Sequence, residues 1–306
     1  AAVSTMNYLP ERGVLSTWGD NHANRSERYL AAIAYLDGVN PSLVMTRGYY
    51  ERTALVAWDY KDKKLVPRWV FDTKTGEHPY AGQGYHNLSV ADVDNDGKDE
   101  IIFGAMCIDD DGKGLYTTGL GHGDALHVSD LDPDRSGLEI FGIHELKGGK
   151  KGVGASLLDA KTGTVLFQGA IDEDVPRGVA ANIDPDHRGA YMWWLGSNLY
   201  DMNGRVVGTA PKQANFLIWW DGDLSRELLD HQTIEKYKQG IIFQAKGATS
   251  NNGTKRTPAL IADILGDWRE ELILRSEDNQ SIRIYTTTIP TSHRLYTLMH
   301  DSVYRL

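Results

Sequence analysis

An acidic segment recurs along this chain, and its recurrence limits the folds that the chain can adopt. The first copy, Asp92–Glu100, has the sequence DVDNDGKDE and places carboxylates at alternate positions around a glycine. Alternating carboxylates around a turn are typical of calcium-binding loops, because calcium prefers six to eight oxygen ligands. The candidate ligands in this copy are Asp92, Asp94, Asp96 and Glu100.

Three further segments repeat this pattern with changes. The second copy contains one extra residue, the third is weaker, and the fourth keeps the first, fifth and ninth positions. We predict calcium at the first two copies and leave the last two open between calcium and an ordinary turn. The candidate ligands are Asp130, Asp132, Asp134 and Glu139 in the second copy, Asn182, Asp184 and Asp186 in the third, and Asp263, Asp267 and Glu271 in the fourth.

The context of the copies excludes an EF-hand. An EF-hand begins in a similar way but needs a glutamate at its twelfth position and flanking helices. Here the acid falls at the ninth position, and apolar runs at 101–104, 140–143 and 272–274 predict buried strands. One such segment alone could be an ordinary turn, but four of one pattern favour metal binding.

The spacing of the copies predicts a β-propeller. Their first positions are 38, 52 and 81 residues apart, and residues 215–223 predict a further strand–turn–strand inside the longest interval. Residues 57–62, 157–163 and 199–204 are apolar runs that turn at an aspartate, which indicates hairpins. A period of about 40 to 50 residues with several short strands predicts an all-β propeller. We expect one domain over 1–306 with roughly five visible blades. Short helices are expected only near 25–35 and 233–240, and in the first of these residues 32–36 read equally well as a strand.

Composition narrows the remaining classes. Cys107 is the only cysteine, so a disulfide framework and a thiolate metal site are excluded, and its apolar neighbours predict a buried thiol. No apolar run approaches membrane-spanning length. The net charge of −10 argues against an anionic partner, although bound cations would neutralise the acidic loops. We expect a monomer with no nucleic-acid or membrane partner.

One basic segment stands out against the acidic background. Residues 246–256 have the sequence KGATSNNGTKR, which is polar and lies just before a predicted strand. It could be a solvated surface loop, or a loop that offers amide, hydroxyl and cationic donors, including Arg256, to an anionic or sugar ligand. Arg177 is a second isolated cation, in a loop that could reach the same face.

Histidines form another candidate metal group. His86, His122 with Asp124, and His144 with Glu145 all lie at predicted strand ends. Two imidazoles and two carboxylates could hold a divalent metal. Histidine is an unusual ligand for calcium, so a transition metal or structural hydrogen bonding remain alternatives.

Several longer segments resemble polysaccharide lyase family 11, the rhamnogalacturonan lyases. They include WGD at 18–20, YLDGVNPSLVM at 35–45, GHGDALH at 121–127 and NGTK at 252–255, and the resemblance covers essentially the whole chain. It implies an eight-bladed propeller that binds several calcium ions and cleaves the rhamnose–galacturonate backbone of pectin (rhamnogalacturonan I) by β-elimination. By this resemblance, the calcium ligands include His86, His122, Asp124 and Glu145. The substrate-cleft residues are Asn252, Gly253, Thr254, Lys255 and Arg177.

The chain also departs from that family. Members are considerably longer, so we expect a fragment that lacks N-terminal and C-terminal blades, with two exposed sheet edges. We therefore do not predict full activity from this chain alone.

The reaction implied by the resemblance removes the C5 proton of galacturonate and expels the C4 oxygen. The neighbouring carboxylate must be neutralised as negative charge builds up, and calcium with Arg177 or Lys255 could do this. Lys255 is also a candidate base, because the adjacent Arg256 disfavours the protonated amine. The rival base, a tyrosine of the family, is expected beyond Leu306.

Two other functions remain open from the sequence. The chain could be a non-catalytic, calcium-stabilised propeller that binds glycan or protein. A glycoside hydrolase ranks last, because it needs a free pair of carboxylates and the acids here are committed to loops. Pectin is too large for uptake, so we expect a secreted protein, although no signal peptide is visible.

Overall fold

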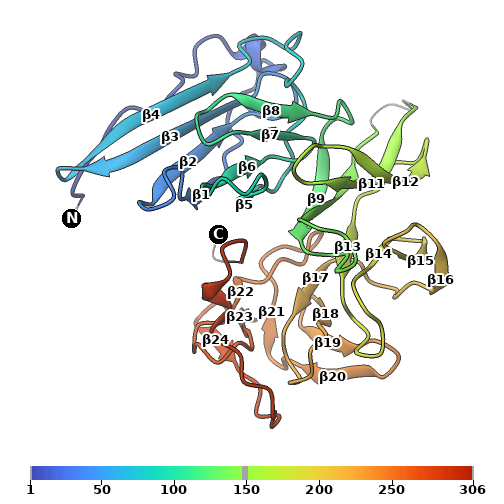
Figure 1. Ribbon diagram of the computed structural model, residues 1–306. Coiled ribbons are helices and arrows are strands. Elements are labelled where there is room, and N and C mark those ends of the chain that lie inside the picture. Colours follow the sequence, from blue (N-terminus) through green and yellow to red (C-terminus); the bar gives the residue numbers. More distant parts are fainter. Residues whose placement is uncertain (1, 147–150, 305–306) are drawn as a thin grey trace. The chain divides into compact units, whose positions relative to one another are not determined.

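The computed structural model describes residues 2–146 and 151–304, and these form antiparallel sheets with almost no helix (Figure 1). The described residues contain 24 strands in six four-stranded sheets, which we call sheets A to F in chain order. The described helices are two short 3-10 turns, η1 (Leu15–Trp18) and η3 (Leu298–His300). The predicted all-β class is confirmed.

The chain divides into two compact units, each with three sheets. Residues 2–130 and 135–176 belong to the first unit, and residues 131–134 and 177–304 belong to the second. The prediction that 1–306 form a single propeller domain stays a prediction.

The first unit contains sheets A, B and C. Their strands are β1 (Ala31–Ala34), β2 (Ser42–Arg47), β3 (Ala54–Lys61) and β4 (Lys64–Asp72) in sheet A; β5 (Ser89–Ala91), β6 (Glu100–Ile102), β7 (Met106–Ile108) and β8 (Gly114–Thr117) in sheet B; and β9 (Gly123–Ser129), β10 (Glu139–His144), β11 (Val153–Asp159) and β12 (Val165–Ile171) in sheet C.

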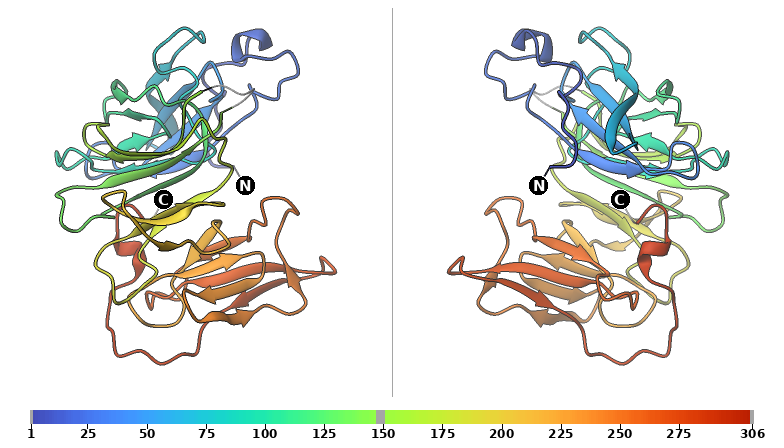
Figure 2. Two further views of the ribbon diagram at one scale, coloured as in Figure 1. Left: turned by 90° about the vertical axis from the view of Figure 1, so that its right-hand side faces the viewer. Right: turned by 90° about the vertical axis from the view of Figure 1, so that its left-hand side faces the viewer.

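The second unit contains sheets D, E and F. Their strands are β13 (Gly178–Ala181), β14 (Tyr191–Trp194), β15 (Asn198–Asp201) and β16 (Val206–Thr209) in sheet D; β17 (Phe216–Ile218), β18 (Glu227–Asp230), β19 (Thr233–Lys236) and β20 (Gly240–Gln244) in sheet E; and β21 (Ala248–Thr249), β22 (Leu260–Ala262), β23 (Glu271–Ser276) and β24 (Ile282–Tyr285) in sheet F. Figure 2 shows residues 286–297 as a loop without regular structure between β24 and η3.

Sheets A to E are simple meanders, in which each strand pairs with the next one along the chain. Sheet F differs, because β21 and β22 both pair with β23, and β24 pairs with β23 on its opposite edge. Residues 250–259 are therefore an excursion that interrupts one edge strand. The basic segment predicted to carry substrate-binding residues lies mainly in this excursion.

The second strands are among the most buried strands of their sheets, and most of the fourth strands are exposed. All residues of β6, β10 and β14 are buried, whereas β16, β20 and β24 are mostly exposed. The apolar runs that follow the acidic segments form these buried second strands, as predicted. Cys107 is buried in β7, and burial raises the pKa of its thiol.

The helix predicted at 233–240 is wrong, and at 32–36 the strand alternative is correct in place of the helix. Residues 31–34 form β1, and residues 233–240 form β19 and the start of β20, because Thr233 and Ile234 are β-branched and alternate residues of β19 are buried. The three predicted hairpins are present as β3–β4, β11–β12 and β15–β16.

Six sheets are present in the described residues, compared with roughly five predicted blades. The strand–turn–strand predicted inside the longest interval is confirmed as β17 and β18 of sheet E. Sheet A is harder to recognise because its first loop, residues 35–41, carries a single aspartate. No described helix is long and apolar enough to span a membrane.

Candidate functional site

The acidic segments occupy the same place in their sheets, namely the connection between the first and second strands. This holds for β5–β6, β9–β10, β13–β14 and the β22–β23 connection of sheet F. We name them loops B, C, D and F after their sheets. Each turns at a glycine with positive φ, between +75° and +104°, a conformation that favours glycine. These are Gly97, Gly137, Gly189 and Gly266.

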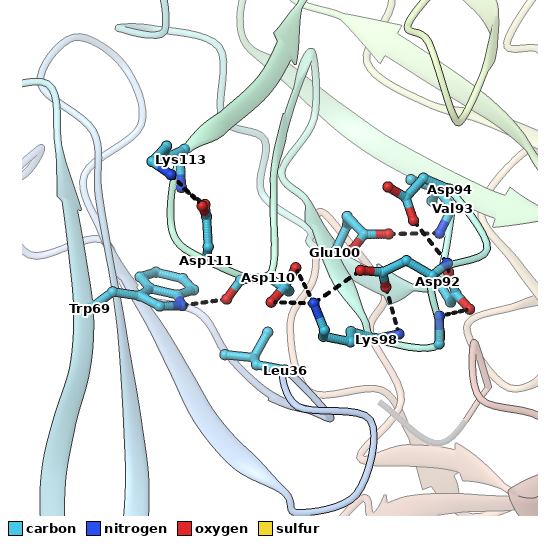
Figure 3. A network of polar contacts seen from close by, with 12 residues as sticks. Leu36, Trp69, Asp92, Val93, Asp94, Lys98, Glu100, Asp110, Asp111 and Lys113 are labelled. Atoms are coloured by element: carbon cyan, nitrogen blue, oxygen red, sulfur yellow. Dashed lines mark hydrogen bonds and ion pairs between the residues drawn. The ribbon is translucent and has the colours of Figure 1, made fainter.

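Loop B (Asp92–Glu100) brings its carboxylates together in two overlapping groups. Ligand oxygens of Asp92, Asp94 and Asp96 lie within 4.8 Å of one another, and a second overlapping group contains Asp96, Glu100 and Asp110. The amides of Asp96 and Gly97 donate to Asp92 at 3.1 and 3.0 Å, which fixes the turn. Figure 3 shows the labelled side chains of Asp92, Asp94 and Glu100 beside one another.

Among the carboxyl groups of loop B, Glu100 is the one whose charged form is most disfavoured. Its Oε2 accepts the Val93 amide at 2.8 Å, while its buried Oε1 has no hydrogen-bond partner. Burial, with the charges of Asp94, Asp92 and Asp96, raises the pKa of Glu100 to about 8. An oxygen without a donor among like charges is a good position for a cation ligand. Lys98 lies nearby but pairs with Asp96 and Asp110.

Loops C, D and F do not form a comparable group. Among the described His, Cys, Asp and Glu residues, none of these loops brings three ligand atoms within 4.8 Å. Asp134 of loop C pairs with Arg188 at 3.0 Å, and Asp184 of loop D pairs with Lys238 at 2.6 Å.

In loop F, hydrogen bonds from the protein already saturate the acids. The two oxygens of Asp263 accept three amides of the loop and two donors from residues 297–298. Oε2 of Glu271 accepts the amides of Ile264 and Leu265 at 3.0 and 3.1 Å. Calcium at loops C, D and F stays a prediction.

The histidine cluster is brought together in the first unit. Ligand atoms of His86, His122 and Asp124 lie within 4.8 Å of one another. Nε2 of His86 is 3.3 Å from Asp124, and Nε2 of His122 is 3.6 Å from Glu145. Backbone hydrogen bonds from His86 to Gly123 and from Glu145 to His122 hold the segments together.

The hydrogen bond of His122 fixes its tautomer. Its Nδ1 lies 2.5 Å from the carbonyl oxygen of Gly84, and because a carbonyl can only accept, Nδ1 carries the proton. In the neutral imidazole, the lone pair is then on Nε2, which faces the carboxylates. This is the arrangement found in histidines that ligate metals.

The basic residues predicted for the substrate cleft meet in the second unit around a pocket of about 320 Å³. Arg177, Gly253, Thr254 and Arg256 line it, whereas Lys255 and Asn252 do not. The lining residues are Arg177, Leu195, Lys212, Gln213, Ala214, Asn215, Asp230, Gly253, Thr254 and Arg256.

The 250–259 excursion is held against the pocket by Arg177. Its guanidinium donates to the backbone carbonyl oxygens of Thr254 and Lys255. Asn252 has an internal role, because its side chain accepts the Lys255 amide at 2.7 Å and donates to Thr257 at 3.1 Å. Arg256 forms an ion pair with Asp230 at 2.5 Å.

Lys212 and Gln213 are among the lining residues that the sequence reasoning missed. Lys212 is exposed at the pocket, and the side-chain nitrogen of Gln213 is buried without a hydrogen-bond partner. Both lie in a polar run, PKQAN at 211–215, immediately before β17. Residues 246–256 were marked as a candidate binding segment because they are polar and precede a strand, and the same criterion could have identified residues 211–215.

The sequence reasoning also missed that a fifth loop brings carboxylates together. Residues 219–227, which we name loop E, connect β17 and β18, and Asp221, Asp223 and Glu227 bring ligand oxygens within 4.8 Å of one another. It turns at Gly222, whose φ is +101°. The sequence shows aspartates at 221 and 223, but a tryptophan, Trp219, stands where loop B has Asp92.

Comparison with known proteins decides the family. The pattern of the family described as "Rhamnogalacturonan lyase family 11, C-terminal domain" matches residues 1–306. The chain belongs to rhamnogalacturonan lyase family 11. The resemblance drawn from the sequence motifs is therefore confirmed.

Two curated relatives from Bacillus subtilis (strain 168) are similar over nearly the whole chain. The rhamnogalacturonan endolyase YesW is 58% identical over 309 residues, which cover 99% of this chain and 49% of YesW. The rhamnogalacturonan exolyase YesX is 54% identical over 328 residues, which cover 100% of this chain and 53% of YesX. This family 11 chain thus spans about half the length of these relatives.

The fold of this family 11 chain also matches a solved structure. The crystal structure of rhamnogalacturonan lyase YesW superimposes with a TM-score of 0.94 at 56% identity. The match covers 99% of this chain and 53% of that structure.

Proposed function

We propose that this chain forms part of a calcium-dependent rhamnogalacturonan lyase, which cleaves the rhamnose–galacturonate backbone of pectin by β-elimination. The observation that carries the proposal is the basic pocket of the second unit. Arg177, Lys212 and Arg256 line it together with one acid, Asp230, so the pocket keeps a net positive charge for a polyanionic substrate in a protein of net charge −10. The names of YesW and YesX support rhamnogalacturonan as the substrate.

The chemistry of β-elimination explains the need for this charge. The C5 proton of galacturonate is weakly acidic, and its removal places negative charge next to the uronate carboxylate. A fixed cation lowers the free energy of that transition state more than that of the ground state. In the proposed roles, Arg177 and Lys212 bind the carboxylate, and the side-chain amide of Gln213 donates to a sugar hydroxyl.

Lys255 is proposed as a carboxylate binder and, with less structural support, as the base. Its amide is fixed by Asn252, and its carbonyl oxygen accepts from Arg177 and Asn215, so its backbone is held in place. Lys255 does not line the pocket described above. Asn252 is proposed to shape the loop around the substrate.

Calcium is proposed to bind where the residues fit it best. Loop B offers Asp92, Asp94, Asp96 and Glu100 as oxygen ligands, which suits a hard cation. The histidine cluster offers Nε2 of His122 with Asp124 and Glu145, and calcium or another divalent metal there would supply positive charge and rigidity.

The test is turnover of rhamnogalacturonan I by the chain, followed by the absorbance of the unsaturated uronate with calcium and with chelator. Binding to the same polymer is measured in parallel by isothermal titration. We expect Lys212→Met to weaken binding about tenfold, as expected for loss of one charge-assisted contact. Lys64→Met, which removes an exposed lysine of the first unit, is the control and should not change binding.

The outcomes separate the candidate functions. Calcium-dependent formation of unsaturated product supports the lyase. Calcium-dependent binding without product supports a non-catalytic binding role for this chain. Cleavage without a new double bond would point to a hydrolase, and no binding in either buffer would exclude the proposal. Because pectin is an extracellular polymer, we propose that the protein acts outside the cell.

A further inference from the structure

A buried lysine on β19, Lys236, lies in the centre of the carboxylates of loop E. Nζ of Lys236 lies 2.8 Å from Asp221, 2.8 Å from Asp223 and 2.7 Å from Glu227. Oγ of Ser225 is a fourth oxygen, at 2.9 Å. The Lys236 side chain is 2% exposed, and that of Glu227 is fully buried. The ammonium nitrogen is therefore surrounded by four oxygens and shielded from water, while the side chains of Asp221 and Asp223 are partly exposed.

Loops E and B share one backbone hydrogen bond to their glutamate but differ in what binds the second oxygen of that glutamate. In loop E, Oε2 of Glu227 accepts the amide of Trp220, seven residues earlier, at 2.8 Å. In loop B, Oε2 of Glu100 accepts the amide of Val93, also seven residues earlier and at 2.8 Å. The second oxygen makes the difference, because Oε1 of Glu227 binds Lys236 whereas Oε1 of Glu100 has no hydrogen-bond partner.

Strand register explains how the lysine reaches this position. Leu228 pairs with Glu235 in sheet E, so Glu227 lies across from Lys236. Ile101 pairs with Ile108 in sheet B, so Glu100 lies across from Asp109. In sheet C, Glu139 pairs directly with Asp159. The position opposite the loop glutamate is thus acidic in sheets B and C and basic in sheet E.

We propose that loop E is an acidic cation loop whose cation is built into the chain, and that the ammonium group of Lys236 takes the place of a divalent metal ion. A lysine on the adjacent strand supplies the positive charge without depending on free calcium. The three carboxylates are neutralised only in part, and the same geometry excludes a second cation from the loop. This inference does not depend on the proposed lyase function.

Lys236→Met tests the proposal, because methionine keeps most of the side-chain volume and removes the charge. We expect the variant to bind one more equivalent of calcium than the wild type in isothermal titration. In chelator its Tm should fall by roughly 5–10 °C, and calcium should restore most of this loss. Terbium gives a second readout, because Trp219 and Trp220 directly precede Asp221 and can sensitise its luminescence.

Two further variants make the result interpretable. Lys61→Met is the matched control, since Lys61 also pairs with one carboxylate, Asp59 at 2.8 Å, but its side chain is 66% exposed. It should gain no calcium and should keep its Tm. Lys236→Met combined with Glu227→Gln removes both buried charges, and this double variant should fold in chelator without an added calcium equivalent.

The proposal is wrong if Lys236→Met folds with an unchanged number of calcium equivalents and an unchanged terbium signal. It is also wrong if Lys236→Met stays unfolded in calcium, or if the double variant fails to fold, because the lysine would then be needed for packing. Calcium binding at loop E of the wild type would also overturn the proposal. It would be shown by a terbium luminescence signal in the wild type that is lost in Glu227→Gln.

Discussion

Loops B and E show two solutions to one electrostatic problem. Both gather acidic side chains at the start of a buried second strand, where their mutual repulsion opposes folding. Loop E places a lysine among its acids and loop B places a further acid, Asp109, across from Glu100. Lys98 of loop B pairs with Asp96 and Asp110 and leaves Oε1 of Glu100 without a hydrogen-bond partner. The group that faces the loop glutamate lies outside both loops, on the third strand in sheet E and just beyond it in sheet B. The charge that faces an acidic loop is therefore set by the neighbouring strand as much as by the loop's own aspartates.

This comparison bears on the proposed substrate pocket. Strands β17 and β18 lead away from loop E, and their other ends carry Asn215 and Asp230, which line the pocket. The ion pairs of Lys236 with loop E would keep this sheet ordered whether or not calcium is present. We therefore expect the pocket to be less sensitive to calcium than loop B.

The largest expected effect comes from removing the buried glutamate of loop E. Glu227→Gln leaves Lys236 buried with one charged partner fewer, and we expect a loss of about 3 kcal/mol in the free energy of unfolding. Urea denaturation followed by tryptophan fluorescence measures this loss. Glu77→Gln, at an exposed position, is the control. An unchanged unfolding midpoint for Glu227→Gln would mean that the two loops do not differ in this way.

Calcium removal should distinguish the loops within one molecule. If loop B binds calcium, saturation at about a hundred times its Kd stabilises it by about 2.7 kcal/mol, which chelator removes. Hydrogen exchange should then accelerate about a hundredfold for the amides of β6 and change little for β18. Equal acceleration in both strands, or in neither, would contradict the comparison.

Alkaline pH should reduce the stabilisation that Lys236 gives to loop E. Burial disfavours the charged ammonium, but the bonds to Asp221, Asp223 and Glu227 outweigh this and raise the pKa of Lys236. A raised folded-state pKa contributes stability that is complete below the unfolded value of about 10.4 and is lost as pH rises through the folded value. Each unit of difference is worth about 1.4 kcal/mol.

We therefore expect the free energy of unfolding to fall faster for the wild type than for Lys236→Met above about pH 10.4. Urea titrations at pH 8 and at increasing alkaline pH provide the measurement. Parallel curves for the two proteins would show that the ammonium of Lys236 does not stabilise loop E.

The smallest expected effect has the opposite sign to the first. In chelator, Glu100→Gln replaces a group whose charged form is disfavoured in the folded state, because burial and like charges raise the pKa of Glu100 to about 8, and we expect a gain of about 1 kcal/mol. In calcium the same variant should be less stable than the wild type, because one ligand is lost. Thermal unfolding in both buffers decides the sign, and destabilisation in chelator would refute this description of loop B.

Much of the fold was accessible from the sequence because it depends on local patterns. The glycines of the loops and the apolar runs after them predict turns and buried strands, and β6, β10 and β23 lie where expected. Helix was wrongly predicted at 233–240, where strand pairing outweighed a weak local preference. Sheet A escapes the repeat pattern because its loop lacks the repeated aspartates.

Some residues of the candidate sites could be predicted from local sequence, and others could not. Residues 252–256 and Arg177 were marked by local charge and do contact one another, but Lys212 and Gln213 became visible only when the pocket formed. The histidines were predicted to converge because strand ends meet, and they do. Their side chains alone leave the identity of the metal open, and the expectation of calcium there rests on the family resemblance.

By itself the sequence determined the repeating unit, an acidic turn followed by a buried strand, and the family to which the chain belongs. Both follow from short-range chemistry, since glycine turns and apolar runs act over a few residues. The tertiary structure decided which acidic loops gather their oxygens and what charge faces them. That depends on register between strands, which places Lys236 against Glu227 and Asp109 against Glu100, and no spacing along the chain specifies such pairs.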